Sequence, residues 1–132
     1  MSETSDAYLA RARESLAGAA SELVNKRYNN AANRAYFAVF QAAVVALEQA
    51  GIRPPGGKDE WSHRQVQALF PPLITRQKRY PTELRPTLRQ LVTLRELADY
   101  GLAGVSEPQA RRAVARAHAF IAAITDQERS TR

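Results

Sequence analysis

The sequence predicts an all-α protein: an antiparallel up-and-down bundle of four long helices plus one short helix, in a single domain over residues 1–132. Two observations support this fold class. Four segments repeat apolar residues at positions i, i+3, i+4 and i+7, the period of a helix that buries one face. No segment alternates apolar and polar residues as a half-buried strand does, and prolines and glycines separate the periodic segments.

The first two helices have the clearest periodicity. Ser5 or Asp6 is expected to cap the first helix, and Gly51 to follow the end of the second, which spans about residues 29–50. Residues 35–47 are apolar nearly all round, which indicates that the second helix is the central, most buried one. The apolar stripe of the first helix comprises Leu9, Ala12, Leu16, Ala19, Ala20 and Leu23.

Prolines divide the middle of the chain. After a Pro- and Gly-rich loop over 51–60, a short helix over 62–70 is expected to stop before Pro71 and Pro72.

The next long helix is expected to begin near residues 82–83, to tolerate Pro86 in its first turn, and to end near Tyr100. The last helix opens with Ser106 and Gln109, which have the spacing of a capping box.

The composition limits the classes of partner and location. Nineteen Lys and Arg against thirteen Asp and Glu give a net charge of +6 and a pI near 10.2, which permits contact with nucleic acid or an acidic partner. The absence of cysteine removes disulfides and fits a reducing cytoplasm, the location that we expect. No apolar run is long enough to cross a membrane, and the start of the chain lacks the pattern of a signal peptide.

Arg95 breaks a leucine stripe. It stands where the spacing of the preceding leucines calls for another, and Asp99 lies one turn further on, where the two can form an i, i+4 ion pair. A buried ion pair adds little net stability once desolvation is counted, so the pair is either a structural salt bridge or part of a site. Residues 76–95 are strongly basic, with Arg85 and Arg89 among the cations, and form either a solvated basic face or a phosphate-binding surface.

A polar line also runs along the otherwise apolar second helix. It consists of Asn30, Arg34, Gln41 and Glu48, spaced by four and seven residues. The line is either the solvent-facing stripe of that helix or one wall of a groove or dimer interface. In the second case Arg34 lies beside Arg95, and two guanidinium groups can grip a phosphate.

We expect different roles for the two histidines. His63 opens the short helix and is either a structural hydrogen bonder or an acid–base group that approaches Arg34, Arg95 and Asp99. His118 is expected on the surface of the last helix. Because metal-binding, P-loop and nucleophile-elbow motifs are missing, we expect neither a metal nor another cofactor.

Four stretches of the chain, in order, resemble the HEPN-domain family. "YNNAANRAYFAVFQAAVVALEQAG" is similar to the family's signature helix, which often reads close to N-R-A-Y-Y-A-x-F-H-A. "SHRQVQALF" and "LRELADYG" resemble its following segments, and "SEPQARRAVARAHAFIAAI" resembles its closing helix. The resemblance covers roughly residues 7–125 and implies a helical bundle that forms homodimers. It also implies a metal-independent RNase or a descendant of one, or a toxin paired with a nucleotidyltransferase antitoxin, or part of a defence system.

The chain departs from the family pattern at the residues on which RNase chemistry would depend. RNase members carry Arg-x4–6-His, in which the arginine stabilises phosphate charge and the histidine moves protons. With Arg95 as that arginine, the histidine position holds Tyr100, and the tyrosine modified in some toxins is replaced by Leu102. The histidine of the signature helix is Gln41, which cannot shuttle a proton near neutral pH.

These observations support three functional hypotheses. The first is a HEPN-like protein that binds RNA or a nucleotide, as a degenerate metal-independent RNase or as a component of a toxin–antitoxin or defence system. The second is a dimeric helical module that binds a nucleotidyltransferase partner. The third is an active ribonuclease that uses Arg95 and His63. The candidate catalytic residues are Arg95, His63, Asp99 and Tyr100, and the candidate phosphate-binding residues are Arg34, Asn33, Gln41, Arg85 and Arg89.

Overall fold

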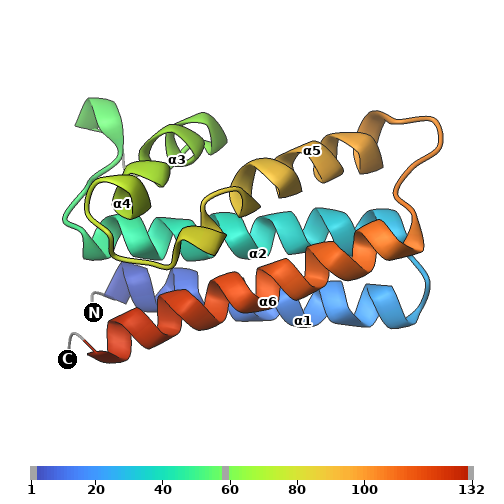
Figure 1. Cartoon of the computed structure of the whole chain (residues 1–132), viewed down its shortest axis with the longest axis horizontal. Coiled ribbons are helices and arrows are strands. Elements are labelled where there is room, and N and C mark those ends of the chain that lie inside the picture. The colour runs from blue at the N-terminus through green and yellow to red at the C-terminus, as the bar shows by residue number, and fades with distance from the viewer. Residues whose placement is uncertain (1–2, 58–59, 131–132) are drawn as a thin grey trace.

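The protein is a bundle of helices around one central helix. The computed structural model describes residues 3–57 and 60–130; Lys58 and Asp59 of the predicted loop, and the two residues at each end, lie outside the described residues. The four long helices are α1 (Glu3–Val24), α2 (Tyr28–Gln49), α5 (Thr87–Tyr100) and α6 (Glu107–Ser130). They alternate in direction along the chain (Figure 1), so the predicted all-α up-and-down bundle is confirmed.

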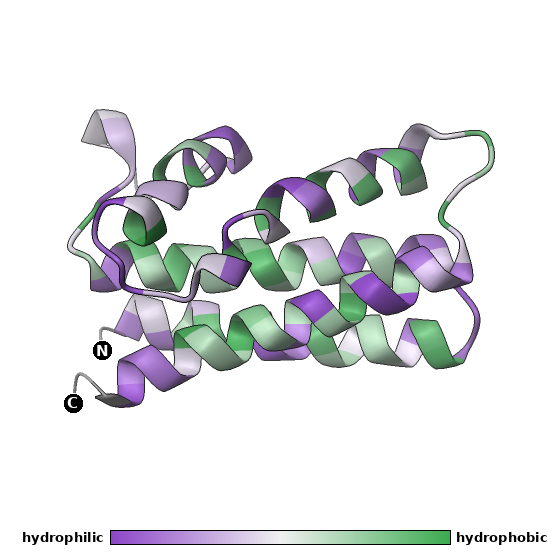
Figure 2. Ribbon diagram, viewed as in Figure 1, coloured by the Kyte–Doolittle hydropathy of each residue, from purple (hydrophilic) through white to green (hydrophobic). Residues whose placement is uncertain are grey.

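The core is centred on α2. This helix packs against α1, α5 and α6, and every residue from 35 to 47 is buried except Phe37 and Gln41, which are partly exposed. Figure 2 shows that α2 is largely apolar, whereas the outer helices mix apolar and polar residues. The prediction that α2 is the most buried helix is therefore confirmed, and only one narrow strip of α2 is left for a site.

The predicted start of the first helix was wrong. Ser5 lies inside α1 and is buried, and its hydroxyl donates a hydrogen bond to Glu48 Oε2 at 3.0 Å. Ser5 is thus used to fasten α1 to the far end of α2 and does not cap its own helix. At the other end of α2, Gly51 adopts a positive φ of 79°, as expected for the residue that follows a helix.

The prolines act differently from the prediction. The short helix α3 (His63–Leu69) ends where expected, but Pro71 and Pro72 then open a further helix, α4 (Pro71–Thr75), because proline fits the first turn of a helix. Pro86 likewise stands at the N-cap of α5, and the segment before it forms only a single 3₁₀ turn, η2 (Thr82–Leu84). A second 3₁₀ turn, η1 (Pro55–Gly57), lies in the loop after α2. The expected long helix from residues 82–83 is therefore interrupted at Pro86.

The last helix begins as predicted. The Ser106 amide donates to Gln109 Oε1 at 2.9 Å and the Gln109 amide donates to Ser106 Oγ at 3.3 Å, which is the reciprocal capping box. The preceding loop is tied to α2, because Asn29 Oδ1 accepts a hydrogen bond from the Val105 amide at 2.8 Å. Within residues 3–57 and 60–130, no helix is both long and apolar enough to cross a membrane.

Candidate functional site

Tyr36 is the centre of an aromatic cluster between α2, α3 and α5. Its side chain is fully buried, and its ring lies against Phe37, Phe40 and His63 with centroid separations of 5.4, 6.3 and 5.4 Å. Burial raises the pKa of the Tyr36 hydroxyl, while hydrogen bonding with Gln67 and the charge of Arg95 oppose that shift. The hydroxyl is therefore a neutral group at physiological pH, held on the inner side of the site.

His63 is fixed by this cluster at the first turn of α3. A capping box between Ser62 and Gln65 starts the helix, and the His63 ring stacks on Phe40 with 4.4 Å between centroids. Its Nδ1 is hydrogen-bonded to the Tyr36 hydroxyl. Burial, and then the charge of Arg95, lower the pKa of His63 below its usual 6.5, so the ring is neutral at pH 7.

Arg95 lies over the same rings from α5. Its guanidinium carbon is 5.2 Å from the Tyr36 ring centroid and 5.3 Å from that of Phe37, distances typical of cation–π contact. Its Nε is buried 3.6 Å from Asp99 Oδ2, with no hydrogen-bond partner among the described residues. The side chain is 32% exposed. An arginine fits this position of the leucine stripe because its side chain covers an aromatic surface and still reaches solvent.

Asp99 connects Arg95 to α2. Its carboxylate forms the predicted i, i+4 ion pair with Arg95 and accepts hydrogen bonds from Asn33 Nδ2, at 3.2 Å to Oδ1 and 3.3 Å to Oδ2. Three of the predicted site residues thus join His63 in one cluster: Arg95, Asp99 and Asn33. We refer to Tyr36, His63, Arg95, Asp99 and Asn33 as the Arg95 cluster.

Arg34 and Gln41 lie on the other side of Phe37, toward α1. The Arg34 side chain lies across Gly18, where a Cβ atom would be 3.1 Å from Arg34 Cδ, so the missing side chain of Gly18 makes room for it. The Gln41 amide nitrogen is oriented to donate to Ser15 Oγ at 2.8 Å and to the Phe37 carbonyl at 3.1 Å, which ties α2 to α1. Arg34 thus lies against α1, whereas His63 lies against Tyr36, Phe37 and Phe40 of α2, so the expected approach of His63 to Arg34 stays a prediction.

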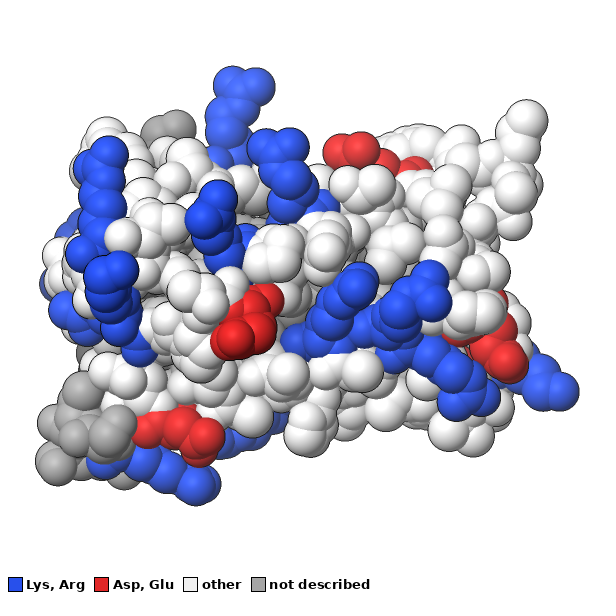
Figure 3. Space-filling model, viewed as in Figure 1, with Lys and Arg blue, Asp and Glu red and all other residues white. Residues whose placement is uncertain are grey.

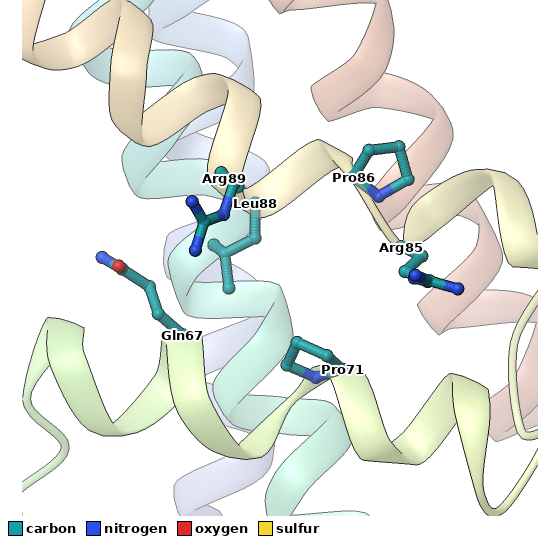
Figure 4. A pocket seen from close by; sticks show the side chains of 6 residues that line it. All are labelled: Gln67, Pro71, Arg85, Pro86, Leu88 and Arg89. Atoms are coloured by element: carbon teal, nitrogen blue, oxygen red, sulfur yellow. The ribbon is translucent and has the colours of Figure 1, made fainter.

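Arg85 and Arg89 border a separate pocket at the start of α5. It encloses about 350 Å³ and is lined by Gln67, Pro71, Arg85, Pro86, Leu88 and Arg89. Figure 4 shows Arg89 and Gln67 facing each other across the opening, while Arg85 points away from it. Gln67 also bonds the Tyr36 hydroxyl, so this pocket adjoins the Arg95 cluster through one side chain.

The structure does not bring Tyr100 to the cluster. Each helical residue turns the side chain by about 100°, so the five steps from Arg95 direct Tyr100 away from the face that carries Asp99. Tyr100 is 83% exposed, and Leu102 is fully exposed. His118 is exposed on α6, as predicted. In the described part of the chain, no three His, Cys, Asp or Glu side chains come together as a metal site would require.

Sequence reasoning missed three side chains of this region. Tyr36, Phe37 and Gln67 build the surface on which Arg95 and His63 lie, yet they were assigned to the core or to no role. The available signal was the aromatic spacing at residues 36, 37 and 40 together with a histidine at a following helix start.

Comparison with family models identifies the family of the chain. The family model for the HEPN domain matches residues 5–127, nearly the whole chain. The chain belongs to the HEPN-domain family. No curated protein matches this HEPN-domain protein significantly. Membership links the chain in general terms to nucleotide- and RNA-related or RNase-like functions.

The surface charge of this HEPN-domain protein is unevenly distributed. Figure 3 shows Lys and Arg side chains gathered over α6 and over the end of the molecule that holds α4, with an acidic patch between the two groups. A surface of this kind attracts polyanions from a distance but carries no specificity by itself. Any specific site must therefore come from groups with fixed geometry, and the Arg95 cluster is such a group.

Proposed function

We propose that this HEPN-domain protein binds RNA, with one phosphate held at the Arg95 cluster. The observation that carries the proposal is the position of Arg95: a partly exposed guanidinium held over two aromatic rings beside a neutral histidine. The rings and Asp99 fix its orientation, so little side-chain freedom is lost when a ligand binds. The outer edge of a guanidinium carries paired donors that match two phosphate oxygens.

The hydrogen bonds of Tyr36 favour binding over proton transfer at His63. Gln67 opposes the rise in the pKa of the Tyr36 hydroxyl, as a group that donates to its oxygen does, and we infer that the hydroxyl proton points to His63 Nδ1. In the neutral ring the proton then resides on Nε2, the nitrogen that remains for a ligand. Nε2–H donates a hydrogen bond to a phosphate oxygen, but it cannot accept the proton of a ribose 2′-hydroxyl.

The direct test is RNA binding by matched variants. Fluorescence anisotropy with a labelled single-stranded RNA should show weaker binding for Arg95→Gln and a smaller loss for Arg95→Lys, which keeps the charge but not the planar fork. Arg112→Gln on the exposed face of α6 removes the same charge away from the cluster and should bind nearly as the wild type. Equal losses in Arg95→Gln and Arg112→Gln would refute a specific role for Arg95.

The same samples distinguish binding from catalysis. Incubation with mixed RNA in the absence of metal should leave the RNA intact, since neither Gln41 nor the Nε2–H tautomer of His63 supplies a base. Cleavage that His63→Gln abolishes, with the fold retained by circular dichroism, would establish the active ribonuclease instead.

A second role is supported by a different observation. Tyr100 and Leu102 are large hydrophobic side chains exposed at the end of α5 and just after it, and exposed apolar groups of this size often mark protein contacts. We propose that this corner contributes to a contact with another protein chain, either the homodimer expected for the family or a nucleotidyltransferase partner. Light scattering tests the homodimer: Leu102→Ser should lower the mass of the species if the corner lies in that interface.

A further inference from the structure

The site does not end at the Arg95 cluster. Three pockets follow one another: the first lies between the α1–α2 turn and the loop before α6, and the other two lie along the seam between α1 and α2. The first encloses about 370 Å³ at the turn between α1 and α2 and includes Lys26, Arg27 and Asn30. The second, also about 370 Å³, includes Asn30, Arg34 and Gln41, and the third, about 190 Å³, includes Arg34, Gln41 and Arg11. The first pocket adjoins the second at Asn30, and the second and third share Ser15, Arg34 and Gln41; we call the three together the α1–α2 furrow.

The lining of the furrow fits a strand of nucleic acid better than it fits an apolar helix. In the middle pocket the walls are amides, a hydroxyl and a cation with Phe37 as the apolar side chain, and the first pocket adds Tyr28, Ala103 and Val105 to its cations and amides. Amides can meet base edges, cations meet phosphates, and an aromatic ring offers a surface for base stacking. One carboxylate, Glu14, lines the third pocket, and Glu22 pairs with Arg27 at 3.5 Å beside the first.

The cations are spaced along the furrow. Lys26 and Arg27 lie at one end, Arg34 in the middle and Arg11 at the other end. From Arg27 to Gln41 the helix rises about 21 Å at about 1.5 Å per residue. That length accommodates no more than about six stacked nucleotides at about 3.4 Å each.

Lys26 has a left-handed backbone because it ends α1: its amide donates to the Leu23 carbonyl at 3.1 Å, and the Arg27 amide donates to the Glu22 carbonyl at 2.9 Å. It stands in the turn between α1 and α2 with φ of 61°, a conformation that glycine adopts readily and lysine rarely. Lys78, after α4, has a φ of 52° and does not line the furrow. The chain thus contains a matched pair of strained lysines, and only one of them faces the furrow.

We infer that the α1–α2 furrow is the track for the single-stranded RNA that continues from the phosphate at the Arg95 cluster, with Phe37 as the junction. Phe37 lines the furrow and also carries the Arg95 guanidinium on its ring. The inference rests on the proposed function, because it names the form of RNA recognised: a single strand several nucleotides long. Affinity should therefore rise with strand length until the furrow is filled.

The test compares Lys26→Gly with Lys78→Gly on labelled oligouridylates of two, four and eight nucleotides. Both substitutions relieve a left-handed lysine and remove one charge, so both should raise the Tm of the protein. For the eight-nucleotide strand, Lys26→Gly should bind about threefold more weakly and lower the slope of log affinity against log salt by about 0.7. Lys78→Gly should bind as the wild type, and all three proteins should bind the dinucleotide alike.

The outcomes separate the two proposals. Wild-type affinity that does not change with length, or equal binding of the eight-nucleotide strand by Lys26→Gly and the wild type, would overturn the furrow and leave the Arg95 site standing. A loss in Lys78→Gly equal to that in Lys26→Gly would show general electrostatic attraction and also overturn it. Absence of any wild-type binding, at every length, would overturn both.

Discussion

The two faces of α2 that flank Phe37 are polar in different ways. On the side of α3 and α5, Tyr36, His63 and Arg95 are stacked and hydrogen-bonded into a fixed group over the core. On the side of α1, Arg34 is exposed and lies against Gly18. The neighbouring Gln41 is held by a hydrogen bond with Ser15. Fixed geometry and accessible charge therefore lie on opposite sides of one aromatic residue. The first suits the recognition of one group, and the second suits contact with an extended ligand.

The largest effect should come from removing the centre of the fixed side. Tyr36→Ala deletes a fully buried ring and should lower the free energy of unfolding by about 3–5 kcal/mol, because it leaves a cavity under Arg95 and His63. Phe37→Ala removes a partly exposed neighbouring ring and should cost clearly less. Urea denaturation of both variants measures the difference; equal losses would show that Tyr36 is not the centre of the fixed side.

A smaller effect is expected on the α1 side. Gln41→Ala removes the hydrogen bond to Ser15 and should cost about 0.5–1.5 kcal/mol of stability. Ser15→Ala removes the same bond from the other helix, so a double-mutant cycle isolates it. Additive losses would mean that the two side chains do not interact, and that Gln41 is only a furrow residue.

Gly18→Ala should sharpen the contrast by stabilising the protein while disturbing the furrow. Alanine favours the helical backbone over glycine by up to about 1 kcal/mol. The new Cβ would meet the flexible, exposed Arg34 side chain, with Cδ at 3.1 Å and a terminal nitrogen at 3.2 Å, and this side chain can move aside. Thermal unfolding should show a higher Tm together with weaker RNA binding. A lower Tm would show that Arg34 is held more firmly than its exposure suggests.

The smallest effect is electrostatic and concerns His63. Burial and the charge of Arg95 lower the pKa of His63 in the folded protein below 6.5. Between the folded-state pKa and 6.5, the unfolded chain binds more protons than the folded protein, so the free energy of unfolding falls as the pH drops through this window. Arg95→Gln removes one cause, so the pKa of His63 should rise and the window should narrow. An NMR titration of the His63 ring in the wild type and in Arg95→Gln measures the shift. An unchanged His63 titration would place Arg95 too far away to act on it.

Much of the fold could be predicted because it depends on local patterns. The apolar run over 35–47 identified the central helix, and Ser106 with Gln109 identified the start of the last one. The prolines were the weaker part, since Pro71 and Pro86 can either end a helix or begin one. Which role a proline takes depends on how the following segment packs, and that information is not local.

The candidate site could be predicted only in part. The ion pair of Arg95 with Asp99 followed from helical spacing, and Arg95 stood out because it interrupts a leucine stripe. Tyr36 and Gln67 could not be assigned, because their partners come from other helices. Tyr100 was proposed from its place in a family motif, and the turn of α5 directs it elsewhere.

By itself the sequence determined that this chain is a basic helical bundle of the HEPN type, because periodicity, caps and composition act over neighbouring residues. Only the tertiary structure decided which polar residues meet. It directed Arg95 and His63 onto Tyr36, and Arg34 onto Gly18, because each pairing depends on the angle at which two helices cross and on the rotation of each about its axis. Neither the crossing angle nor the rotation can be derived from the sequence of one helix alone.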